Sequence, residues 1–484
     1  MTMKLKELLA GVSVLESTAD MEQNILSVAY DSRKVMAGGL FVAISGFATD
    51  GNRFIPMALE KGAVAVVTAK RPQGDVPYIL VESDRLALAL IGCNFYGHPA
   101  KSMTMIGVTG TNGKTSTTLL LKQVLEKTIG AKVGLIGTME NMVGDEIIPT
   151  ERTTPESFEL QGLFARMRDA GCTHVVMEVS SHAIALDRVA GVHFDVGAFT
   201  NLTEDHLDFH KTMEAYCDTK AVLFRRCDFG VANRDDAYFE PMTAGAECKM
   251  LTTSVKGDAD LRAEELELHA DGICFTAVAK DKKQKVSLPI PGRFTVYNAL
   301  SVLGISLQLG ISLESAAKAL ASAKGVKGRV EVVPTPGKPY TVLVDYAHTP
   351  DGLENVLRSV RDYCKGRLIA VFGCGGDRDP IKRPIMGRIG VELADIAVIT
   401  SDNPRTEAPM DIIADILEGV SREKENYIVI EDRRKAIQYA MDIAGKDDMI
   451  VLAGKGHETY QEINGVKHHL DEREEVAAHL METR

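Results

Sequence analysis

One short segment constrains the fold more than any other: an apolar run that opens into glycines and then into Gly113-Lys114-Thr115. Residues 103–108 before it are apolar enough for a buried strand, and apolar side chains recur at helical spacing after it. In such a strand–loop–helix unit, backbone N–H groups and the helix N-terminus face phosphate oxygens. Lys114 is placed to reach the β- and γ-phosphates, and the Thr115 hydroxyl to ligate Mg²⁺. The segment therefore predicts a nucleoside triphosphate site.

This loop is a variant of the usual phosphate-binding pattern. The strict pattern has a glycine five positions before Gly113, and this chain has Val108 there. The alternative is a glycine-rich turn between a strand and a helix that binds no ligand. The Gly-Lys-Thr ending favours the phosphate-binding interpretation.

Apolar runs of strand length alternate with helical patterns along most of the chain, which predicts an α/β fold with a mainly parallel, doubly wound sheet. In the central part, the predicted strands are 103–108, 132–136 and 174–178, and the predicted helices are 114–128 and 157–170. Further on, the predicted strands are 341–345, 368–372, 396–400, 427–430 and 449–452, and the predicted helices are 350–360, 382–393 and 433–444. Residues 261–290 alternate apolar and polar side chains around Asp271-Gly272, which predicts an antiparallel meander.

The length of 484 residues suggests about three domains of ~150 residues each. Clusters of Gly and Pro at residues 97–99 and 334–337 are natural boundaries. The predicted domains are residues 1–98, 99–333 and 334–484, and the central one carries the phosphate loop.

The composition excludes several classes of protein. A net charge of −12 disfavours binding to nucleic acid or to a membrane surface. The eight cysteines include no Cys-x-x-Cys pair, so neither a zinc knuckle nor a thioredoxin-like site is indicated. No apolar run approaches the ~20 residues of a membrane span, and the N-terminus lacks the plan of a signal peptide. We expect a cytoplasmic protein.

Polar and glycine-rich residues follow four predicted strands of the last domain, at residues 345–348, 373–378, 402–405 and 454–458. Ligands of open α/β sheets bind at the carboxyl ends of strands. Arg378, Arg405 and Lys455 bring three cations to this edge of an acidic protein. Because guanidinium groups bind carboxylates in bidentate geometry, these residues indicate an anionic substrate.

Two further features of the central domain could bind a metal. Glu178 ends a predicted strand and could hold Mg²⁺; the alternative is a strand-end charge that faces solvent. His206 and His210 are four residues apart and would share one face of a helix. A zinc site would need ligands that this spacing does not supply, so a helix-capping segment is the favoured interpretation of the histidines.

Lys220 lies among apolar residues in the predicted amphipathic helix 216–224. It is either a surface lysine that extends its ammonium to solvent or an interior lysine. An interior lysine must be paired or modified, because a bare buried ammonium is costly.

The order and the number of these motifs resemble those of the Mur ligase family of peptidoglycan synthesis. The resemblance covers essentially the whole chain. The segments that carry the resemblance are residues 31–33, 110–115, 153–155, 178–182, 201–206, 220, 328–331, 345–350, 402–405 and 454–458. The resemblance implies three domains: one for a UDP moiety, a central ATPase, and a C-terminal Rossmann-like domain for the incoming amino acid. It implies a cytoplasmic monomer that uses ATP and Mg²⁺ to join meso-diaminopimelate to the D-glutamate γ-carboxylate of UDP-MurNAc-L-Ala-D-Glu through an acyl phosphate.

The resemblance also implies roles for individual residues. Catalytic roles fall to Lys114, Glu178, His206 and Lys220. ATP contacts fall to Gly110, Thr111, Asn112, Gly113, Lys114, Thr115, Ser116, Asn298, Arg329, Asp345 and His348. Tyr30, Ser32, Thr153, Thr154, Ser180 and Arg188 would bind the UDP-sugar peptide, and Arg378, Asp402, Asn403, Pro404, Arg405, Gly454 and Glu458 would bind diaminopimelate. Thr115, Glu178, His206 and a carbamylated Lys220 would hold Mg²⁺.

Three positions depart from the pattern of some relatives. Leu186 stands in place of a Gln, Thr295 in place of an Asn, and residues 47–49 read Phe-Ala-Thr in place of His-Gln-Ala. None of the three touches the core chemistry.

Other activities stay open. The lysine-adding ligase of the same step shares the fold and mechanism but usually lacks an arginine at the position of Arg405, so Arg405 favours diaminopimelate. A folylpolyglutamate synthetase would lack the first domain. A nucleotide-switched binding protein could use the same phosphate loop.

Overall fold

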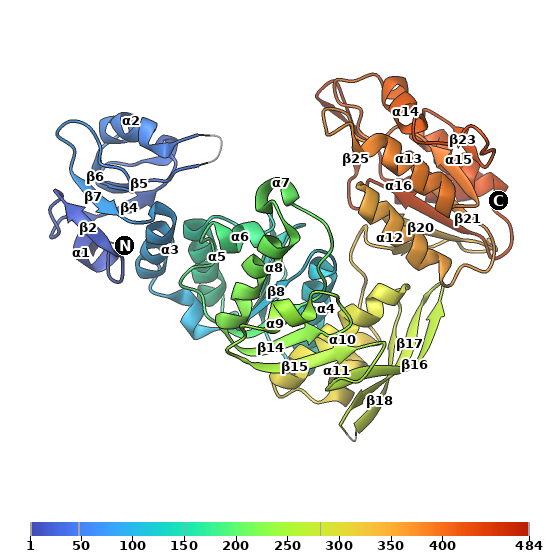
Figure 1. The fold of residues 1–484 in the computed structure, drawn as a ribbon, viewed down its shortest axis with the longest axis horizontal. Coiled ribbons are helices and arrows are strands. Elements are labelled where there is room, and N and C mark those ends of the chain that lie inside the picture. The colour runs from blue at the N-terminus through green and yellow to red at the C-terminus, as the bar shows by residue number, and fades with distance from the viewer. Residues whose placement is uncertain (1, 47–48, 151, 281, 483–484) are drawn as a thin grey trace. The chain divides into compact units, whose positions relative to one another are not determined.

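The computed structural model describes residues 2–46, 49–150, 152–280 and 282–482. The chain folds into two compact units. The first comprises Met1–Asp260 and Ser301–Ser312, and the second comprises Leu261–Leu300 and Leu313–Arg484. Figure 1 labels the helices and strands of both units.

The first unit begins with a five-stranded sheet in the order β2-β7-β6-β5-β4. Its strands are β2 (Val14–Ser17), β4 (Ser27–Ala29), β5 (Gly39–Ala43), β6 (Ala63–Thr68) and β7 (Tyr78–Val81). All neighbouring pairs are parallel except β2 with β7. The helices are α1 (Leu5–Leu8), α2 (Ile55–Glu60) and α3 (Asp84–Phe95), with 3-10 turns at Ser32–Lys34 and Gly51–Phe54, and β1 (Met3–Lys4) pairs with β3 (Asn24–Ile25).

A second sheet of the first unit holds the phosphate loop, with strand order β11-β10-β9-β12-β8-β13-β14-β15. Its strands are β8 (Thr104–Thr109), β9 (Val133–Ile136), β10 (Asn141–Val143), β11 (Glu146–Ile148), β12 (His174–Glu178), β13 (Phe194–Phe199), β14 (Cys227–Asn233) and β15 (Lys249–Ser254). The neighbouring strands β9, β12, β8, β13, β14 and β15 are parallel, and β10 is antiparallel to both β9 and β11. The helices are α4 (Lys114–Ile129), α5 (Ser157–Asp169), α6 (Ser181–Ala185), α7 (Leu207–His210), α8 (Met213–Ala221) and α9 (Phe239–Thr243), with 3-10 turns at Pro99–Ser102 and Val222–Arg225.

The register of this sheet brings three strand ends to one edge. Val108 of β8 pairs with Glu178 of β12 and with Ala198 of β13. The strands β8, β12 and β13 are almost wholly buried, as expected for parallel strands covered on both faces. The phosphate loop after β8 and the carboxylate of Glu178 therefore lie at the same edge.

In the second unit, an antiparallel meander is formed by β16 (Leu261–His269), β17 (Gly272–Ala279) and β18 (Lys282–Leu288). Helix α11 (Leu313–Leu320) packs against β18. Helix α10 (Arg293–Gln308) has residues 293–300 in the second unit and 301–308 in the first.

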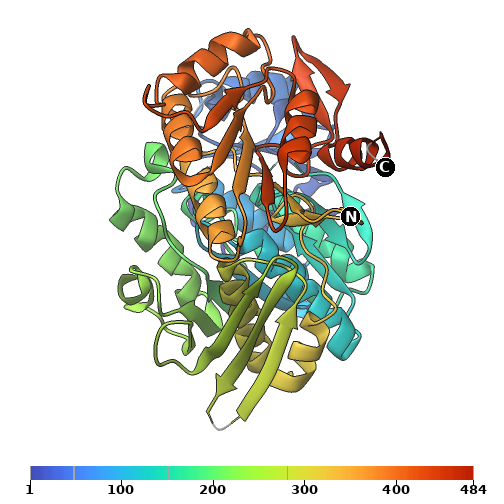
Figure 2. The ribbon, with the colours of Figure 1, turned by 90° about the vertical axis from the view of Figure 1, so that its right-hand side faces the viewer.

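The second unit also contains a six-stranded sheet in the order β19-β20-β24-β21-β22-β23. Figure 2 draws the chain from β20 onward in orange to red. Its strands are β19 (Glu331–Val333), β20 (Thr341–Asp345), β21 (Leu368–Phe372), β22 (Ile396–Ile399), β23 (Tyr427–Val429) and β24 (Met449–Ala453), and only β19 is antiparallel to its neighbour. Helices α12 (Pro350–Arg361), α13 (Lys382–Leu393) and α14 (Pro409–Leu417) share a hydrophobic core with one face. Helices α15 (Arg433–Ile443) and α16 (Glu472–Glu482) share a core with the other, so the sheet is doubly wound.

The predicted α/β class, the parallel sheets and the meander are confirmed, and most predicted bounds agree within one or two residues. The predicted helix 216–224 is wrong at its C-terminal end, because the chain tightens into a 3-10 turn from Val222. The sequence analysis missed two hairpins, β10–β11 and β25–β26 (Tyr460–Ile463 and Val466–His469), because their short strands carry little periodicity.

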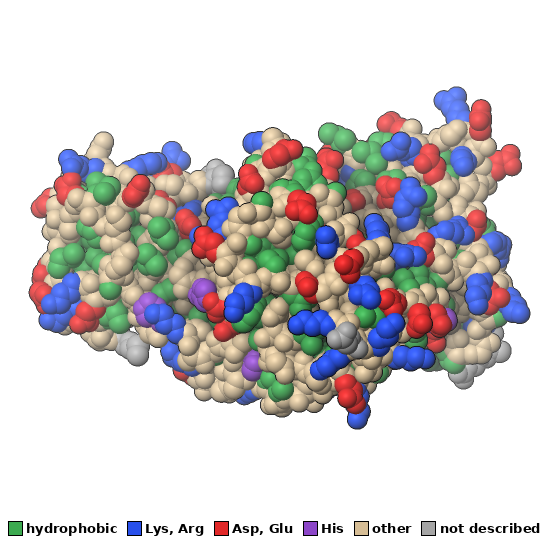
Figure 3. All heavy atoms as spheres, turned by 60° about the horizontal axis from the view of Figure 1, so that its bottom comes forward, with side chains coloured by type: hydrophobic (Ala, Val, Ile, Leu, Met, Phe, Trp, Pro, Cys, Tyr) green, Lys and Arg blue, Asp and Glu red, His purple; other side chains and the backbone are tan. Residues whose placement is uncertain are grey.

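On the face drawn in Figure 3, Lys and Arg side chains are interspersed with Asp and Glu. Within the described residues, no helix is long and apolar enough to cross a membrane.

Candidate functional site

The phosphate loop connects the central strand β8 to helix α4, which begins after Gly113. Gly110 has a φ of 144°, and a Cβ atom on it would lie 2.0 Å from Thr200 Oγ1. Only glycine fits this position, because any side chain would collide with the residues that directly follow β13 and would need a strained backbone. The loop is thus held against the strand beside it, with the N-terminus of a 16-residue helix behind it.

Two lysine side chains converge on this loop. Lys114 Nζ donates to the carbonyls of Gly110 and Thr111 at 2.9 and 2.7 Å. Lys220 Nζ also donates to the Gly110 carbonyl, at 2.8 Å. The predicted loop lysine therefore has a second lysine side chain beside it.

Lys220 is an interior residue, so the surface-lysine alternative is wrong. Its side chain is 1% exposed, and its Nζ lies 4.7 Å from the centre of the Tyr216 ring. Burial, and then the nearby charge of Lys114, lower the pKa of Lys220 well below its usual value. This lowering favours the neutral amine.

Glu178 is also buried, which contradicts the alternative that it faces solvent. Its Oε1 accepts hydrogen bonds from Thr115 Oγ1 and from the Thr138 backbone N–H, both at 2.9 Å. Its Oε2 accepts from Thr138 Oγ1 at 3.0 Å. The predicted metal pair, Thr115 and Glu178, is therefore in direct contact, and both supply the oxygen ligands that Mg²⁺ prefers.

The two histidines predicted to share a helix face differ in burial. His206 precedes the four-residue helix α7 with a left-handed φ of 54°, and its side chain is 47% exposed. His210 is buried, and its Nε2 lies 2.9 Å from Ser181 Oγ. Among the described residues, no group of three or more His, Cys, Asp or Glu side chains could hold a metal. The His206 ring packs 6.3 Å from the Tyr216 ring, which also contacts Lys220.

The buried His210 predicts acid sensitivity. Burial is the main cause that lowers the pKa of His210 from 6.5 to about 4, so the folded protein favours the neutral ring. The resulting stability is present above pH 6.5 and is lost as the pH falls, because the unfolded chain then binds a proton that the folded chain does not. Between pH 7.5 and 5.5 we expect the wild type to lose about 1 kcal/mol more unfolding free energy than His210→Gln. Urea unfolding at both pH values measures the difference, with the exposed His193→Gln as control. Equal pH dependence of wild type and His210→Gln would refute this role.

The residues predicted to hold a UDP-sugar peptide gather mostly around the end of β12. Thr154 Oγ1 donates to the Glu178 carbonyl at 2.9 Å and to Ser180 Oγ at 3.4 Å. Arg188 Nη1 donates to the Thr154 carbonyl at 3.3 Å. Thr153 Oγ1 lies 3.0 Å from Thr138 Oγ1, the hydroxyl that also binds Glu178.

Tyr30 and Ser32 come from the first sheet. Burial and a hydrogen bond to Glu159 of α5 raise the pKa of Tyr30. Ser32 is buried and contacts Met57 Sδ at 3.4 Å. Tyr30 thus reaches the helix that follows Thr154, whereas Ser32 contacts Met57 of α2.

In the second unit, the predicted ATP-side residues surround the turn after β20. The buried carboxylate of Asp345 accepts hydrogen bonds from the backbone N–H groups of Val330 and Ala347 at 2.7 and 2.8 Å, and burial raises its pKa. The Arg329 guanidinium stacks 5.1 Å from the centre of the Tyr346 ring. His348 Nδ1 lies 2.8 Å from the Tyr346 carbonyl, and Asn298 is buried in α10.

The residues predicted to bind an amino acid form a second cluster at the same edge. Asn403 Nδ2 donates to Glu458 Oε2 at 2.8 Å. The fully buried Lys455 donates to Asn403 Oδ1 at 3.0 Å and to Glu458 Oε2 at 3.1 Å. Gly454 has a φ of 119°, and a Cβ on it would lie 2.5 Å from Asp402 Oδ2. The turn after β22 and the turn after β24 are therefore joined.

Arg405 and Arg378 flank Gly375 in this cluster. An ideal Cβ on Gly375 would lie 3.0 Å from Arg405 Nη1 and 3.9 Å from Arg378 Cγ. Arg405 Nη1 donates to the Gly376 carbonyl at 2.8 Å, while Arg378 is exposed. Pro404 is buried between Asn403 and Arg405. The Arg405 guanidinium and the aliphatic part of the Arg378 side chain thus both border Gly375.

Reasoning from the sequence missed several residues that support these sites. Thr138 binds Glu178, and Glu156 forms ion pairs with Arg188 at 2.8 Å and Arg85 at 3.3 Å. Glu156 directly follows the Thr-Thr-Pro motif, a signal that could have found it. Arg433 is fully buried and donates to the Ala453 carbonyl at 2.9 Å. The residues around it in the sequence do not distinguish it from an arginine on the exposed face of a helix.

The three departures from the resemblance have few structural consequences. Leu186 ends α6, and nothing in the structure explains the absence of a Gln there. Thr295 Oγ1 donates to the Pro291 carbonyl at 2.8 Å near the start of α10. Of residues 47–49, Phe47 and Ala48 lie outside the described residues.

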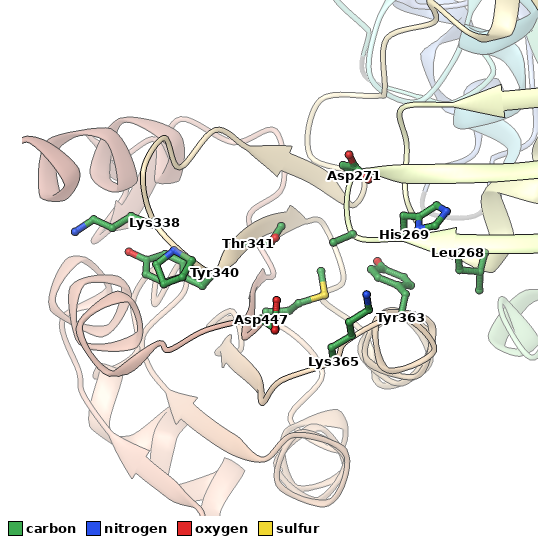
Figure 4. A pocket seen from close by; sticks show the side chains of 12 residues that line it. Leu268, His269, Asp271, Lys338, Tyr340, Thr341, Tyr363, Lys365 and Asp447 are labelled. Atoms are coloured by element: carbon green, nitrogen blue, oxygen red, sulfur yellow. The ribbon is translucent and has the colours of Figure 1, made fainter.

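A cavity of about 380 Å³ in the second unit is separate from these clusters (Figure 4). Its lining includes Thr341 and Met449, the first residues of β20 and β24. The candidate site lies at the opposite ends of these strands, after Asp345 and Ala453.

A phosphate-binding loop after the central strand of a parallel sheet, with Thr115 hydrogen-bonded to the buried Glu178, defines a phosphate-loop α/β protein. Three domain descriptions of one family match the chain: the Mur ligase family catalytic domain at residues 24–96, the Mur ligase middle domain at residues 108–306, and the Mur ligase glutamate ligase domain at residues 328–456. The chain belongs to the Mur ligase family, whose members are ATP-using ligases.

Individual relatives are similar over nearly the full length. The chain is 50% identical over 98% of its length to the UDP-N-acetylmuramoyl-L-alanyl-D-glutamate–2,6-diaminopimelate ligase of Clostridium tetani (strain Massachusetts / E88), of which it covers 98%. It is 49% identical over 99% of its length to the ligase of the same name from Caldanaerobacter subterraneus subsp. tengcongensis, of which it covers 100%. A solved structure of a ligase of that name has 32% identity and a TM-score of 0.75, with 100% of this chain and 99% of that chain covered.

Proposed function

We propose that this protein adds meso-diaminopimelate to the D-glutamate γ-carboxylate of UDP-MurNAc-L-Ala-D-Glu, with ATP converted to ADP and phosphate, in the synthesis of peptidoglycan precursors. The observation that carries the proposal is the identity of about half of all residues, over nearly the whole chain, to ligases of that name. The hydrogen-bonded pair Thr115–Glu178 and the cluster that contains Arg405 supply the chemistry that such a reaction needs.

The reaction has two steps, because a carboxylate is a poor electrophile. A γ-carboxylate oxygen first attacks the terminal phosphorus of ATP, so that an acyl phosphate forms and ADP leaves. The amine of diaminopimelate then attacks the acyl carbon, phosphate leaves, and the amine loses a proton. Lys114 and the backbone N–H groups of the loop offset the repulsion between these anions. Thr115 and Glu178 would hold Mg²⁺, which would neutralise charge on the phosphate oxygens.

The buried Lys220 supports a further part of the proposal, namely carbamylation. A neutral amine attacks CO₂ to form a carbamate and releases one proton, and the lowered pKa of Lys220 favours that neutral amine. The carbamate would turn a buried cation into a carboxylate-like ligand. It would act with Glu178 and His206 at the metal site.

The remaining residue assignments are proposals of the same kind. Thr153, Thr154, Ser180 and Arg188, which gather near Glu178, would hold the UDP-sugar peptide together with Tyr30 and Ser32. Arg329, Asp345, His348 and Asn298 would contact ATP. The domain bounds 1–98, 99–333 and 334–484, the monomer and the cytoplasmic location stay predictions.

The choice of amino acid provides the test of the proposed function. Diaminopimelate differs from lysine by one distal carboxylate, which Arg405 would bind in bidentate geometry. Such a charge-assisted pair contributes ~1.5–3 kcal/mol, so the wild type should prefer diaminopimelate over L-lysine roughly 10- to 150-fold in kcat/KM. Arg405→Ala should lose this preference, and Arg405→Lys should regain only part of it, because an ammonium lacks the planar fork.

The measurement is amino-acid-dependent phosphate release, with UDP-MurNAc-L-Ala-D-Glu and Mg-ATP held constant. The exposed Arg422→Ala serves as control, because it removes the same charge from the same unit. Equal use of both amino acids by the wild type would favour a lysine-adding or unselective ligase. A rate of phosphate release that does not depend on the amino acid would favour a nucleotide-switched binding protein.

A further inference from the structure

The hairpin β25–β26 fixes the backbone of Arg405. Its two-residue turn, Asn464-Gly465, has positive φ angles of 50° and 76°, as hairpins of this length prefer. The Arg405 N–H donates to the Glu462 carbonyl at 3.0 Å, and the Asn464 N–H donates to the Arg405 carbonyl at 2.7 Å. Arg405 itself has a left-handed φ of 52°, which is uncommon for a residue with a side chain. The hairpin therefore holds Arg405 by both of its backbone polar groups.

The same hairpin places a carboxylate beside the Arg405 guanidinium. Glu462 Oε2 lies 3.4 Å from Arg405 Nε, and the two side chains are 27% and 21% exposed. On the other side of the guanidinium, Nη1 donates to the Gly376 carbonyl at 2.8 Å. Arg405 thus has a counter-ion within its own chain before any amino acid binds.

This counter-ion changes how the site distinguishes amino acids. A guanidinium without a partner in a partly buried site would strongly disfavour a ligand that lacks the distal carboxylate. With Glu462 beside it, the charge of Arg405 is still balanced when a ligand without the distal carboxylate binds. Glu462 also competes with the distal carboxylate of a ligand that has one, because both are anions that pair with the same guanidinium.

We propose that Glu462 is a specificity-determining residue that weakens the discrimination by Arg405 between amino acids with and without a distal carboxylate. This inference rests on the proposed function and adds a residue to the same site. In the absence of substrate, the Glu462 carboxylate pairs with Arg405 as the distal carboxylate of the substrate would.

The test is Glu462→Gln, which removes the charge and keeps the side-chain size. The backbone bonds of residue 462 to Arg405 and to Asn403 Oδ1 do not involve the side chain, so the hairpin should keep its place. We expect the ratio of kcat/KM for meso-diaminopimelate to that for L-lysine to rise about three- to fivefold, the range of a partly exposed ion pair. In an Arg405→Ala background, Glu462→Gln should leave the ratio unchanged.

The matched control is Glu474→Gln. It removes the same charge from a carboxylate that lies 2.6 Å from His469 of the same hairpin, and it should leave the ratio unchanged. A ratio that stays constant or falls in Glu462→Gln would overturn the inference, as would an equal loss with both amino acids, which would indicate only a structural role. If the wild type uses neither amino acid, the proposed function fails and the inference fails with it. A wild type that prefers diaminopimelate, with no change in Glu462→Gln, refutes the inference alone.

Discussion

Replacing Lys114 by alanine should reduce ligation roughly 10²- to 10³-fold or more, because the variant loses the cation nearest the expected phosphates. In the structure, Lys114 Nζ donates to two loop carbonyls, at 2.7 and 2.9 Å, and a bound nucleotide would offer it phosphate oxygens instead. The side chain is partly exposed, so the fold should persist.

The measurement is the rate of ADP formation with all three substrates, together with the thermal unfolding midpoint. The exposed Lys101→Ala, in the turn before β8, is the control and should keep normal turnover. Near-normal turnover of Lys114→Ala would show that the phosphate loop is assigned wrongly. A loss of activity that comes with a collapsed unfolding midpoint would show instead that Lys114 supports the fold.

Replacing Lys220 by alanine should have an effect of similar size, for a different reason. A carbamylated Lys220 would supply oxygen ligands, and Lys220→Ala removes them while leaving a space beside Gly110 and Tyr216. We expect activity to fall roughly 10²-fold or more. Formate or acetate should restore part of it, because a small carboxylate can occupy that space.

The readout is ligation rate against carboxylate concentration in Lys220→Ala, with Lys211→Ala as control. Lys211 lies on the neighbouring helix segment and is exposed, so its variant should be active and should not respond to formate. Absence of rescue, combined with a free ammonium at Lys220 in protein prepared with CO₂ present, would rule out the carbamate. Rescue of the control variant to the same extent would make the carboxylate effect nonspecific.

The parts of the site that the sequence could predict are those set by local order along the chain. Glycines between an apolar run and a helical pattern define the phosphate loop, and Glu178 ends a run that parallel pairing aligns with it. The α/β class likewise follows from the alternation, along the chain, of apolar runs of strand length with helical patterns of apolar residues. Even the burial of Lys220 has a local signal, because Tyr216 and Cys217 lie on the same face of α8, three and four residues before it.

Other features depend on contacts between residues far apart in sequence. Arg433 is buried because Glu472, 39 residues later, accepts from its Nε and Nη2 at 2.9 and 2.7 Å. No local pattern distinguishes it from an exposed arginine at the start of a helix. The left-handed backbone of Arg405 is likewise set by a hairpin that lies more than 50 residues further along the chain.

The central claim is the identity of the product, and mass spectrometry of the nucleotide product tests it most directly. The protein is incubated with UDP-MurNAc-L-Ala-D-Glu and Mg-ATP, and with an equimolar mixture of meso-diaminopimelate and L-lysine. The account predicts that the UDP-linked peptide gains one diaminopimelate residue with loss of one water, and that one ADP forms for each product. A product that gains lysine instead, or ADP that forms without any mass change in the peptide, would contradict it.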